Sequence, residues 1–414
     1  MKTEPTLEGE EKADDLSASG KVRLPALLAE TTAVQALGTM AVLTIPALAP
    51  AVAATLNVPA SQVGYQIGAV YFAGMLASLI AGTVVARVGP CRTSQIAMLM
   101  NAAGCLLASI PTVAAVLVGS LIIGAGYGII NPAASELLIR HSPPARRNLI
   151  FSIKQTGVPL GGMTAGLIGP SVALAFGWHA VLWSVAAACI LAAGFSQIGR
   201  AKLDIHRGSS GKQRLFSLNA LKAVMESRSL RWLAMSSFCF SAFQLCLIAF
   251  LVALLVEDLK FDLVAAGAML AAVQALGAIG RMLWGIVADR ARDGMGVLFG
   301  LACTMTAGAA MLAIFDPNWP RYLVMAPLLA LGLSAVGWNG VYLSEIARLS
   351  RPNAVSATTG AAMFFTFTGV VFGPAIFSLL HDAVGSYLRS YGFLACISLA
   401  GALMVLAARS RRPG

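Results

Sequence analysis

Two basic residues interrupt long stretches of the sequence that otherwise carry almost no charge. Arg281 lies in GRMLWGIVAD (280–289), roughly 12 Å of helix rise before Asp289, and Lys154 lies in FSIKQTGVPLGG (151–162), about 10 Å beyond Arg147. A charge at this depth in hydrocarbon costs about 2.5–3.5 kcal/mol and usually faces a partner or a watery chamber. A guanidinium fork fits a carboxylate, and an ammonium adds a point charge. If both residues face one chamber, they predict an anion site; alternatively, both side chains reach the headgroups.

Uncharged polar and aromatic residues at mid-span are further candidates for the same chamber. An unpaired amide is costly in hydrocarbon, so each should face a neighbouring helix or the chamber. The preferred contacts for a bound molecule are Gln155, Gln244 and Asn339, with Trp338 and Tyr342 beside Asn339. The alternative role for each amide is a hydrogen bond between helices.

Glu30, near the start of the first apolar block, is the candidate for carrying a proton. A carboxyl buried there could take up and release a proton, whereas the alternative is a helix-start carboxylate stabilised by the helix dipole. The four histidines fall in loops or at block ends, and the seven cysteines form no CxxC pattern. We therefore predict neither a metal site nor a cofactor, and the absence of HExxH, GxSxG and a phosphate-binding glycine loop argues against an enzyme.

The elements that position these residues are long apolar blocks. Hydrophobic residues make up 58% of the chain and charged residues 11%, compared with roughly one quarter charged residues in a soluble domain. Each block has about the length of a helix that crosses about 30 Å of hydrocarbon. We predict an all-α membrane protein with twelve transmembrane helices, at 24–54, 62–86, 93–110, 112–137, 148–176, 179–197, 231–256, 263–288, 295–315, 321–346, 355–380 and 386–408.

Positive charge is distributed unevenly along the chain, which has a formal net charge of +11. If the amino terminus is cytoplasmic, only Lys260, Arg321 and Arg389 of the 29 Lys and Arg lie outside, and Lys154 and Arg281 lie within spans. This is the positive-inside bias of a multi-pass membrane protein, and no basic patch alternates with aromatic residues as a nucleic-acid surface would. We expect a protein of the cytoplasmic (inner) membrane with both termini in the cytoplasm and no nucleic-acid partner.

A polar interruption at 198–230 divides the apolar blocks six and six. Landmarks recur in the same order and at nearly constant separation in the two halves: Gly82 and Gly285, Ser135 and Ser344, Gly169 and Gly373. Such duplications are typical of secondary transporters, whose site lies between the halves. The predicted parts are a disordered cytoplasmic tail (1–23), a six-helix bundle (24–197), a cytoplasmic linker (198–230), a second six-helix bundle (231–408) and a short tail (409–414).

A loop pattern of glycine, aspartate and arginine follows the second and the eighth predicted helix. The later copy contains Gly285, Asp289, Arg290 and Arg292. The earlier copy contains Gly82, Arg87, Gly89 and Arg92, but Ala86 stands where the aspartate would be. With twelve spans and a central loop, the chain from 24 to 408 resembles the major facilitator superfamily, which carries this pattern at both places. The fold that the resemblance implies is two pseudo-symmetric six-helix bundles.

The resemblance implies a structural role for these loops at an inner gate. Asp289 would cap a neighbouring helix start and pair with arginines. Glu136 and Glu345, which are followed by Arg140 and Arg348, would join such charge clusters. The alternative is that these two glutamates are helix-end charges in the headgroup region.

The segment GRMLWGIVAD also resembles the eighth helix of monocarboxylate transporters and of the oxalate:formate antiporter family, in which an arginine at this register binds the substrate carboxylate. The resemblance implies that role for Arg281, and the superfamily arrangement implies that helices five and eight face each other across the seam between the halves. Gly277 stands where monocarboxylate transporters place an aspartate, so their proton-coupling scheme does not carry over.

The fifth predicted helix is rich in small residues and contains a proline. Gly157, Gly161 and Gly162 allow close helix packing, while Pro159 frees a backbone carbonyl and permits a bend. The stretch partly resembles the fifth-helix signature of proton-driven drug antiporters, but it has one residue rather than two between the proline and the paired glycines. We interpret it as a site of gating flexibility.

Together these features predict a monomeric secondary transporter in the lipid bilayer. Its substrate is expected to be a small organic anion, a mono- or dicarboxylate, moved by alternating access with a proton or in exchange for another anion. The alternative on the same fold is a drug or lipophilic-cation:proton antiporter, which buried positive charge at the seam disfavours.

Overall fold

The computed structural model describes residues 24–58, 64–204, 219–261, 263–316, 319–320 and 322–409. The predicted tail at 1–23 and most of the predicted linker lie outside the described residues. The principal helices of the first half are α2 (Leu24–Ala47), α3 (Ala49–Leu56), α4 (Gly64–Val88), α5 (Pro90–Ala108), α6 (Val113–His141), α7 (Arg147–Gln155), α8 (Gly157–Phe176) and α9 (Trp178–Leu203). Those of the second half are α10 (Asn219–Glu226), α11 (Arg228–Ala253), α12 (Leu263–Ala291), α13 (Gly294–Ala313), α14 (Tyr322–Ala335), α15 (Asn339–Leu349), α16 (Val355–Val384) and α17 (Tyr387–Arg409).

The predicted all-α membrane fold is confirmed. No strand occurs among the described residues, and in that part of the chain eleven helices or continuous helix pairs are long and apolar enough to span a membrane. The predicted span at 93–110 is α5, which completes the set of twelve by its position between α4 and α6. Its buried face carries Thr93, Ser94, Gln95 and Asn101, and these polar residues make it less apolar than the others.

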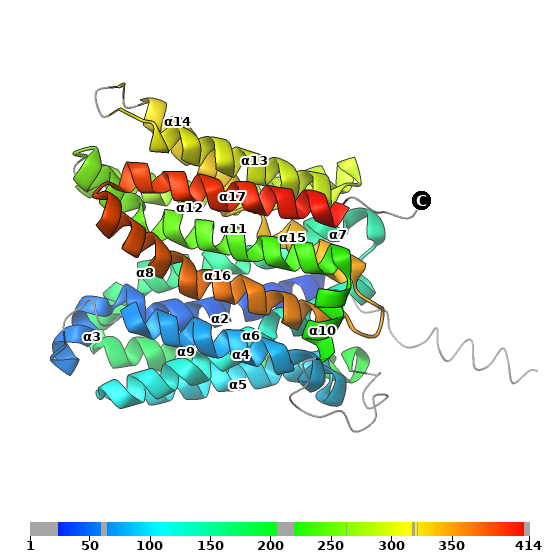
Figure 1. Cartoon of the computed structure of the whole chain (residues 1–414). Coiled ribbons are helices and arrows are strands. Elements are labelled where there is room, and N and C mark those ends of the chain that lie inside the picture. The colour runs from blue at the N-terminus through cyan, green and yellow to red at the C-terminus, as the bar shows by residue number, and fades with distance from the viewer. Residues whose placement is uncertain are drawn as a thin grey trace, which may run out of the picture.

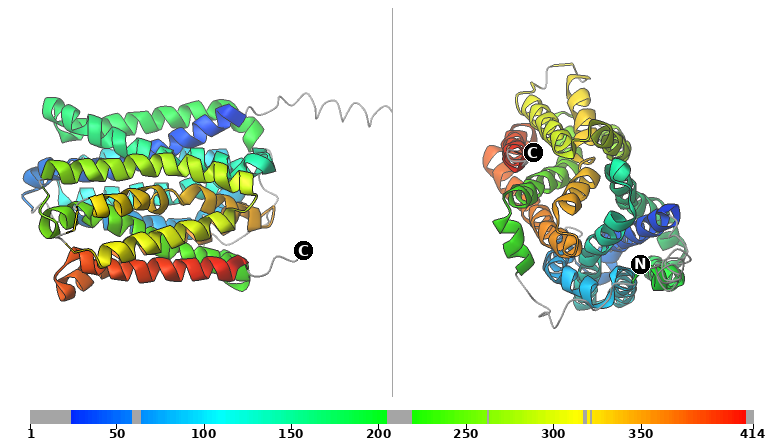
Figure 2. Two further views of the ribbon diagram at one scale, coloured as in Figure 1. Left: turned by 90° about the horizontal axis from the view of Figure 1, so that it is seen from above. Right: turned by 90° about the vertical axis from the view of Figure 1, so that its right-hand side faces the viewer.

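The long helices run roughly parallel and gather into two groups (Figures 1 and 2). The groups meet along two lines of contact, which together we call the seam: α16 packs on α4 and α6, and α12 and α15 pack on α7. In the order of predicted spans these are helix eleven on helix two and helix eight on helix five, so the predicted pairing of helices five and eight is confirmed. The helix ends near α7 and α10 lie at the right-hand end of Figure 1, the side that the sequence predicts to be cytoplasmic.

Glycines from the two loop patterns let the halves approach closely at the seam. A Cβ on Gly82 would lie 2.3 Å from Ala357 Cα on α16, and one on Gly285 would lie 2.7 Å from Ser152 Oγ on α7. Gly340 of α15 meets the same serine, since its Cβ would lie 2.3 Å from Ser152 Cα. The repeated glycine therefore makes equivalent contacts in the two halves.

Three of the predicted continuous spans are interrupted in the structure. The first span breaks between α2 and α3, the fifth between α7 and α8 at Thr156, and the tenth between α14 and α15 at Val336, Gly337 and Trp338. Hydrophobic length predicts a crossing but does not register local breaks, which depend on proline and on close packing. The breaks in the fifth and tenth spans lie directly beside predicted site residues.

Candidate functional site

A cavity of about 90 Å³ lies between the two halves. Its lining comes from both halves and consists of Tyr71, Tyr127, Asn131, Gln155, Val158, Ser241, Gln244, Leu245, Arg281, Trp338, Asn339, Met363, Thr366, Phe367 and Val370. The cavity contains four of the residues that the sequence predicts to be polar or charged contacts, namely Gln155, Gln244, Arg281 and Asn339, together with Trp338. No aspartate or glutamate is among these described lining residues.

Arg281 is buried inside the protein and does not reach toward headgroups. Arg281 is 2% exposed, and its Nη1 donates a hydrogen bond of 2.6 Å to the backbone carbonyl of Gln155 on α7. Its Nε is buried and has no hydrogen-bond partner among the described residues. A buried guanidinium with an unused donor and no neighbouring carboxylate in the cavity is suited to bind an anion.

The position of Arg281 follows from close packing of its helix. The preceding residue, Gly280, lets α12 pack on α14, because a Cβ there would lie 2.4 Å from the Leu333 carbonyl. Gly337, at the break after α14, faces Gly280 in this contact. A Cβ added to Gly337 would lie 3.2 Å from the carbonyl carbon of Gly280. This face of α12 is therefore fixed on α14, and Arg281 points across the seam to α7.

The Gln155 carbonyl is free because of Pro159. In a helix, the carbonyl of residue 155 would accept from the N–H of residue 159, and proline has none. The sequence predicts that Pro159 frees a carbonyl, and the structure shows that Arg281 uses it. α7 ends at Gln155 and α8 begins at Gly157.

Lys154 is also buried, with 1% exposure, and lies next to the cavity wall. Its Nζ donates to Gln35 Oε1 and Asn131 Oδ1, both at 2.5 Å, and to Gln155 Oε1 at 3.3 Å. All three partners are neutral amides, so none of them cancels its charge. Lys154 is not itself among the lining residues; it reaches the cavity through Asn131 and Gln155.

The amides of the second half form a smaller cluster on the opposite wall. Gln244 Oε1 accepts from Trp338 Nε1 at 3.0 Å and from Asn339 Nδ2 at 3.2 Å. Tyr342 is not among the lining residues; its ring packs against Trp338 with centroids 5.2 Å apart, and its hydroxyl donates to the Ala362 carbonyl. The helix break before Asn339 places Trp338 and Asn339 at this wall.

Sequence reasoning missed the aromatic part of the cavity wall. Tyr71, Tyr127 and Phe367 form a mutual cluster with ring centroids 6.0–6.2 Å apart. Phe367 comes from α16 and the tyrosines from α4 and α6, so the cluster crosses the seam. Aromatic residues in apolar spans are common, and only their meeting in space distinguishes these three.

Glu30 lies away from the cavity. Its carboxyl hydrogen-bonds to Ser196 on α9, within the first half, and Asp204 is a neighbouring charge. It is not among the cavity-lining residues. Proton binding at Glu30 would therefore have to act on the cavity through other residues.

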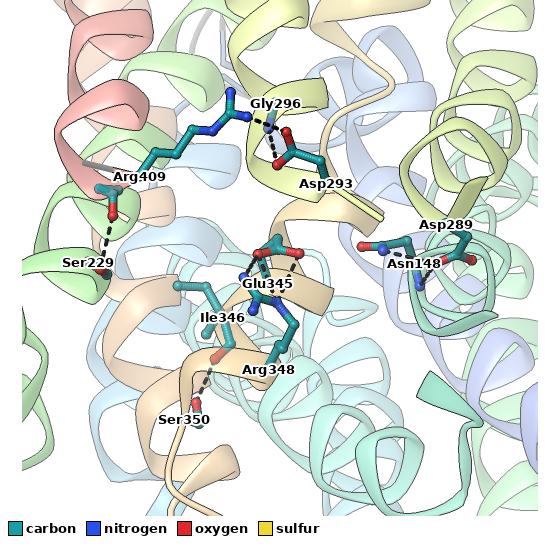
Figure 3. Close-up of polar contacts among 11 residues, drawn as sticks. Asn148, Ser229, Asp289, Asp293, Gly296, Glu345, Ile346, Arg348, Ser350 and Arg409 are labelled. Atoms are coloured by element: carbon teal, nitrogen blue, oxygen red, sulfur yellow. Dashed lines mark hydrogen bonds and ion pairs between the residues drawn. The ribbon is translucent and has the colours of Figure 1, made fainter. Parts of the chain in front are cut away.

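Asp289 caps a helix of the opposite half, as the resemblance implied. Its two carboxylate oxygens accept from the backbone N–H groups of Asn148 and Leu149 at 3.0 and 2.9 Å. The Asn148 side chain adds a bond of 2.9 Å to the same carboxylate (Figure 3). These donors are in the first turn of α7, where a carboxylate is favoured by unpaired N–H groups and by the helix dipole. Arg290 and Arg292 follow at the end of α12, and Arg292 has left-handed backbone (φ 53°).

Glu136 makes the reciprocal contact at the other line of the seam. It comes from α6, and its Oε2 accepts from the Ser356 N–H at the start of α16 at 2.9 Å, while its Oε1 pairs with Arg140 at 2.5 Å. The first-half loop has Ala86 in place of the aspartate. A carboxylate from another helix therefore caps the second half here, and sequence reasoning did not foresee this cap.

Two further carboxylates on the predicted inner side act within one half. Glu345 forms an ion pair with Arg348 (Figure 3). Asp204, which the sequence did not single out, caps α5 by accepting from the N–H groups of Cys91 and Arg92 at 2.9 and 3.1 Å. Gly89 makes this possible because it has φ 92° and a Cβ there would lie 2.4 Å from Asp204 Cγ.

Comparison with known proteins places the chain in a family. The model of the Major Facilitator Superfamily matches residues 31–366. The chain belongs to this superfamily. It is a multi-pass membrane protein.

Several relatives and solved structures are similar to the chain. An uncharacterized MFS-type transporter of Mycobacterium tuberculosis is 29% identical over 230 residues, which is 55% of this chain and 50% of the relative; the match thus spans half the length of that protein. The hexuronate transporter of Bacillus subtilis is 21% identical over 87% of each chain. The structure of the Escherichia coli fucose:proton symporter has a TM-score of 0.74 at 19% identity, covering 94% of this chain and 98% of that one. The human organic anion transporter gives a TM-score of 0.74 at 14% identity, covering 93% of this chain and all of that one.

Proposed function

We propose that the chain carries a small organic anion, a mono- or dicarboxylate, across the cytoplasmic membrane by alternating access. It does so as a monomer with both termini in the cytoplasm, and the transport is either proton-coupled or an exchange of anions. The observation that carries the proposal is the buried Arg281, whose Nε has no partner among the described residues and which lines a cavity without an acidic residue in its described wall.

Charge and size both support a small anion. Arg281 and Lys154 together bring two positive groups to one region, and their described partners are neutral. An anion between the halves would offset this charge in a low-dielectric setting, where the interaction is strong. A cavity of about 90 Å³ leaves room for a carboxylate of a few heavy atoms.

Two of the similar proteins are named for anionic cargo, the hexuronate transporter and the human organic anion transporter. These names are consistent with an anion but do not choose among anions. A lipophilic cation, the alternative cargo, is disfavoured because the described lining contains the guanidinium of Arg281 and no acidic residue to offset a second positive charge.

Replacing Arg281 with glutamine tests the proposal. Purified wild-type protein is screened by thermal shift against mono- and dicarboxylates and cationic dyes, because a ligand that binds only the folded state raises the melting temperature. Carboxylates should stabilise the wild type, and Arg281→Gln should abolish both that shift and uptake into proteoliposomes. Arg389→Gln is the control: it removes the same charge at an exposed position on the predicted outer side, and it should leave the thermal shift and the uptake unchanged. Stabilisation by cations alone, or carboxylate uptake that survives in Arg281→Gln, would overturn the proposal.

A further inference from the structure

One backbone carbonyl of the first half is bonded to the anion-binding candidate of the second half. Arg281 Nη1 on α12 donates to the Gln155 carbonyl on α7 at 2.6 Å, and both residues are buried. We call this hydrogen bond the seam bond. Both residues line the cavity, and Arg281 is about 12 Å of helix rise from Asp289.

The seam bond depends on a proline four residues after Gln155. On either side the chain keeps the helical pattern, since Thr156 N–H donates to the Ser152 carbonyl at 3.2 Å and Leu160 N–H donates to the Thr156 carbonyl at 3.1 Å. Residue 159 would supply the donor for Gln155 in this pattern, and Pro159 has no N–H. The carbonyl is thus available to Arg281 because residue 159 is proline.

A carbonyl oxygen on a guanidinium occupies the kind of position that a carboxylate oxygen would take. Bidentate binding of a carboxylate to arginine needs two parallel N–H donors. In this structure Nη1 is used by the carbonyl while Nε has no partner among the described residues. A guanidinium has five N–H donors and the carbonyl takes one of them at Nη1, so a carboxylate can dock on the Nε side while the seam bond stays in place.

We propose that Pro159 is a positioning residue: it presents the Gln155 carbonyl to Arg281, so that the seam bond joins the halves and holds the guanidinium in the orientation that receives the substrate carboxylate. Loss of the seam bond then removes one contact between α7 and α12 and frees the guanidinium to turn. The substrate half of this inference rests on the proposed function. The seam bond itself needs no ligand, so it can be tested separately.

The first test measures the ligand-free protein. Spin labels are placed at Ala145→Cys and Asn353→Cys, exposed positions on the predicted cytoplasmic side of the two halves, after the exposed Cys303 and Cys396 are changed to serine. Pro159→Ala supplies the missing N–H to Gln155. Loss of one hydrogen bond to a charged group should raise the ratio of inward-open to inward-closed protein by about tenfold in pulsed electron resonance distances. Pro170→Ala, an exposed proline on the same helix, should leave the distances unchanged.

A double variant separates the seam bond from a simple change of helix bend. If Pro159 acts through Arg281, Pro159→Ala should add nothing to the distances of an Arg281→Gln protein. Pro159→Gly, which also supplies an N–H, is the second variant in case the alanine protein does not fold. Unchanged distances in a folded Pro159 variant, or an equal change in the Arg281→Gln background, would overturn the seam bond as the link.

The second test measures carboxylate affinity. Pro159→Ala should raise the apparent Kd by about three- to tenfold, because the guanidinium is no longer held in place by the carbonyl. If carboxylates do not bind the wild type at all, the proposed function fails and the orienting role fails with it, while the distance measurements still decide the seam bond. If they bind the wild type and Pro159→Ala with equal affinity, the orienting role alone is wrong.

Discussion

Glu136→Gln is expected to loosen the contact between the halves on the predicted cytoplasmic side without changing the shape of the side chain. The carboxylate is buried and accepts from the Ser356 N–H at 2.9 Å across the seam. An amide oxygen in the same place can still accept this bond. The variant therefore removes the charge and keeps the volume.

The size of the effect follows from these contacts. A hydrogen bond to a charged group contributes about 1.5–3 kcal/mol, against about 0.5–1.5 kcal/mol for a neutral one, so the loss at the cap is about 1–1.5 kcal/mol. The ion pair to Arg140 adds little, because the arginine side chain is 35% exposed. We expect the opening equilibrium at this end to rise by about five- to tenfold.

Hydrogen–deuterium exchange of the peptide that contains the start of α16 measures this opening in lipid nanodiscs. Exchange at Ser356 and its neighbours should accelerate by that factor in Glu136→Gln, and much less in Arg140→Gln, which keeps the cap. Adding Ala86→Asp, which restores the aspartate of the loop pattern, should return exchange toward the wild-type rate. Equal exchange in wild type and Glu136→Gln would refute the reasoning that the charge closes this gate.

Two further predictions follow from the buried contacts. Lys154→Met should weaken carboxylate binding by about three- to tenfold in titrations, less than Arg281→Gln, because Lys154 acts from behind Asn131 and Gln155; an equal loss in the two variants would mean direct contact with the ligand. Gly340→Ala should destabilise the protein by about 1–3 kcal/mol and lower its melting temperature by a few degrees, because the new Cβ would meet Ser152 Cα at 2.3 Å. Gly300→Ala, where a Cβ meets nothing within 4 Å, is the control, and a similar melting temperature in both variants would contradict the close contact at the seam.

The sequence predicts the fold well because hydrophobic length and charge asymmetry are properties of single segments. The membrane helices and the pairing of the fifth and eighth spans are found as expected. The helix breaks are not, because an apolar run reads the same whether or not the helix is interrupted. The break before Asn339 depends on how closely α12 and α14 pack, and packing is a property of two segments together.

The hydrogen-bond partners of the candidate site residues are harder to predict from the sequence than the candidate residues themselves. Pro159 predicts a free carbonyl, but only the structure identifies Arg281 as its donor. Lys154 stands out as a charge in an apolar helix, whereas Gln35 and Asn131, its two close partners, resemble any other polar residue at mid-span. The cap by Glu136 could not be read from the loop pattern, which has lost its aspartate at Ala86, because the replacement comes from a different helix.

The two inter-half caps run in opposite directions. Glu136 reaches from the first half to α16, and Asp289 reaches from the second half to α7. Each bundle thus supplies one carboxylate and one set of backbone N–H donors. A rotation that separates the bundles has to break the hydrogen bonds of both carboxylates during the same movement. Stripping only one of them leaves the other as a pivot. Two caps of opposite direction should therefore open and close together at the predicted cytoplasmic end, and half-parted bundles should be sparsely populated.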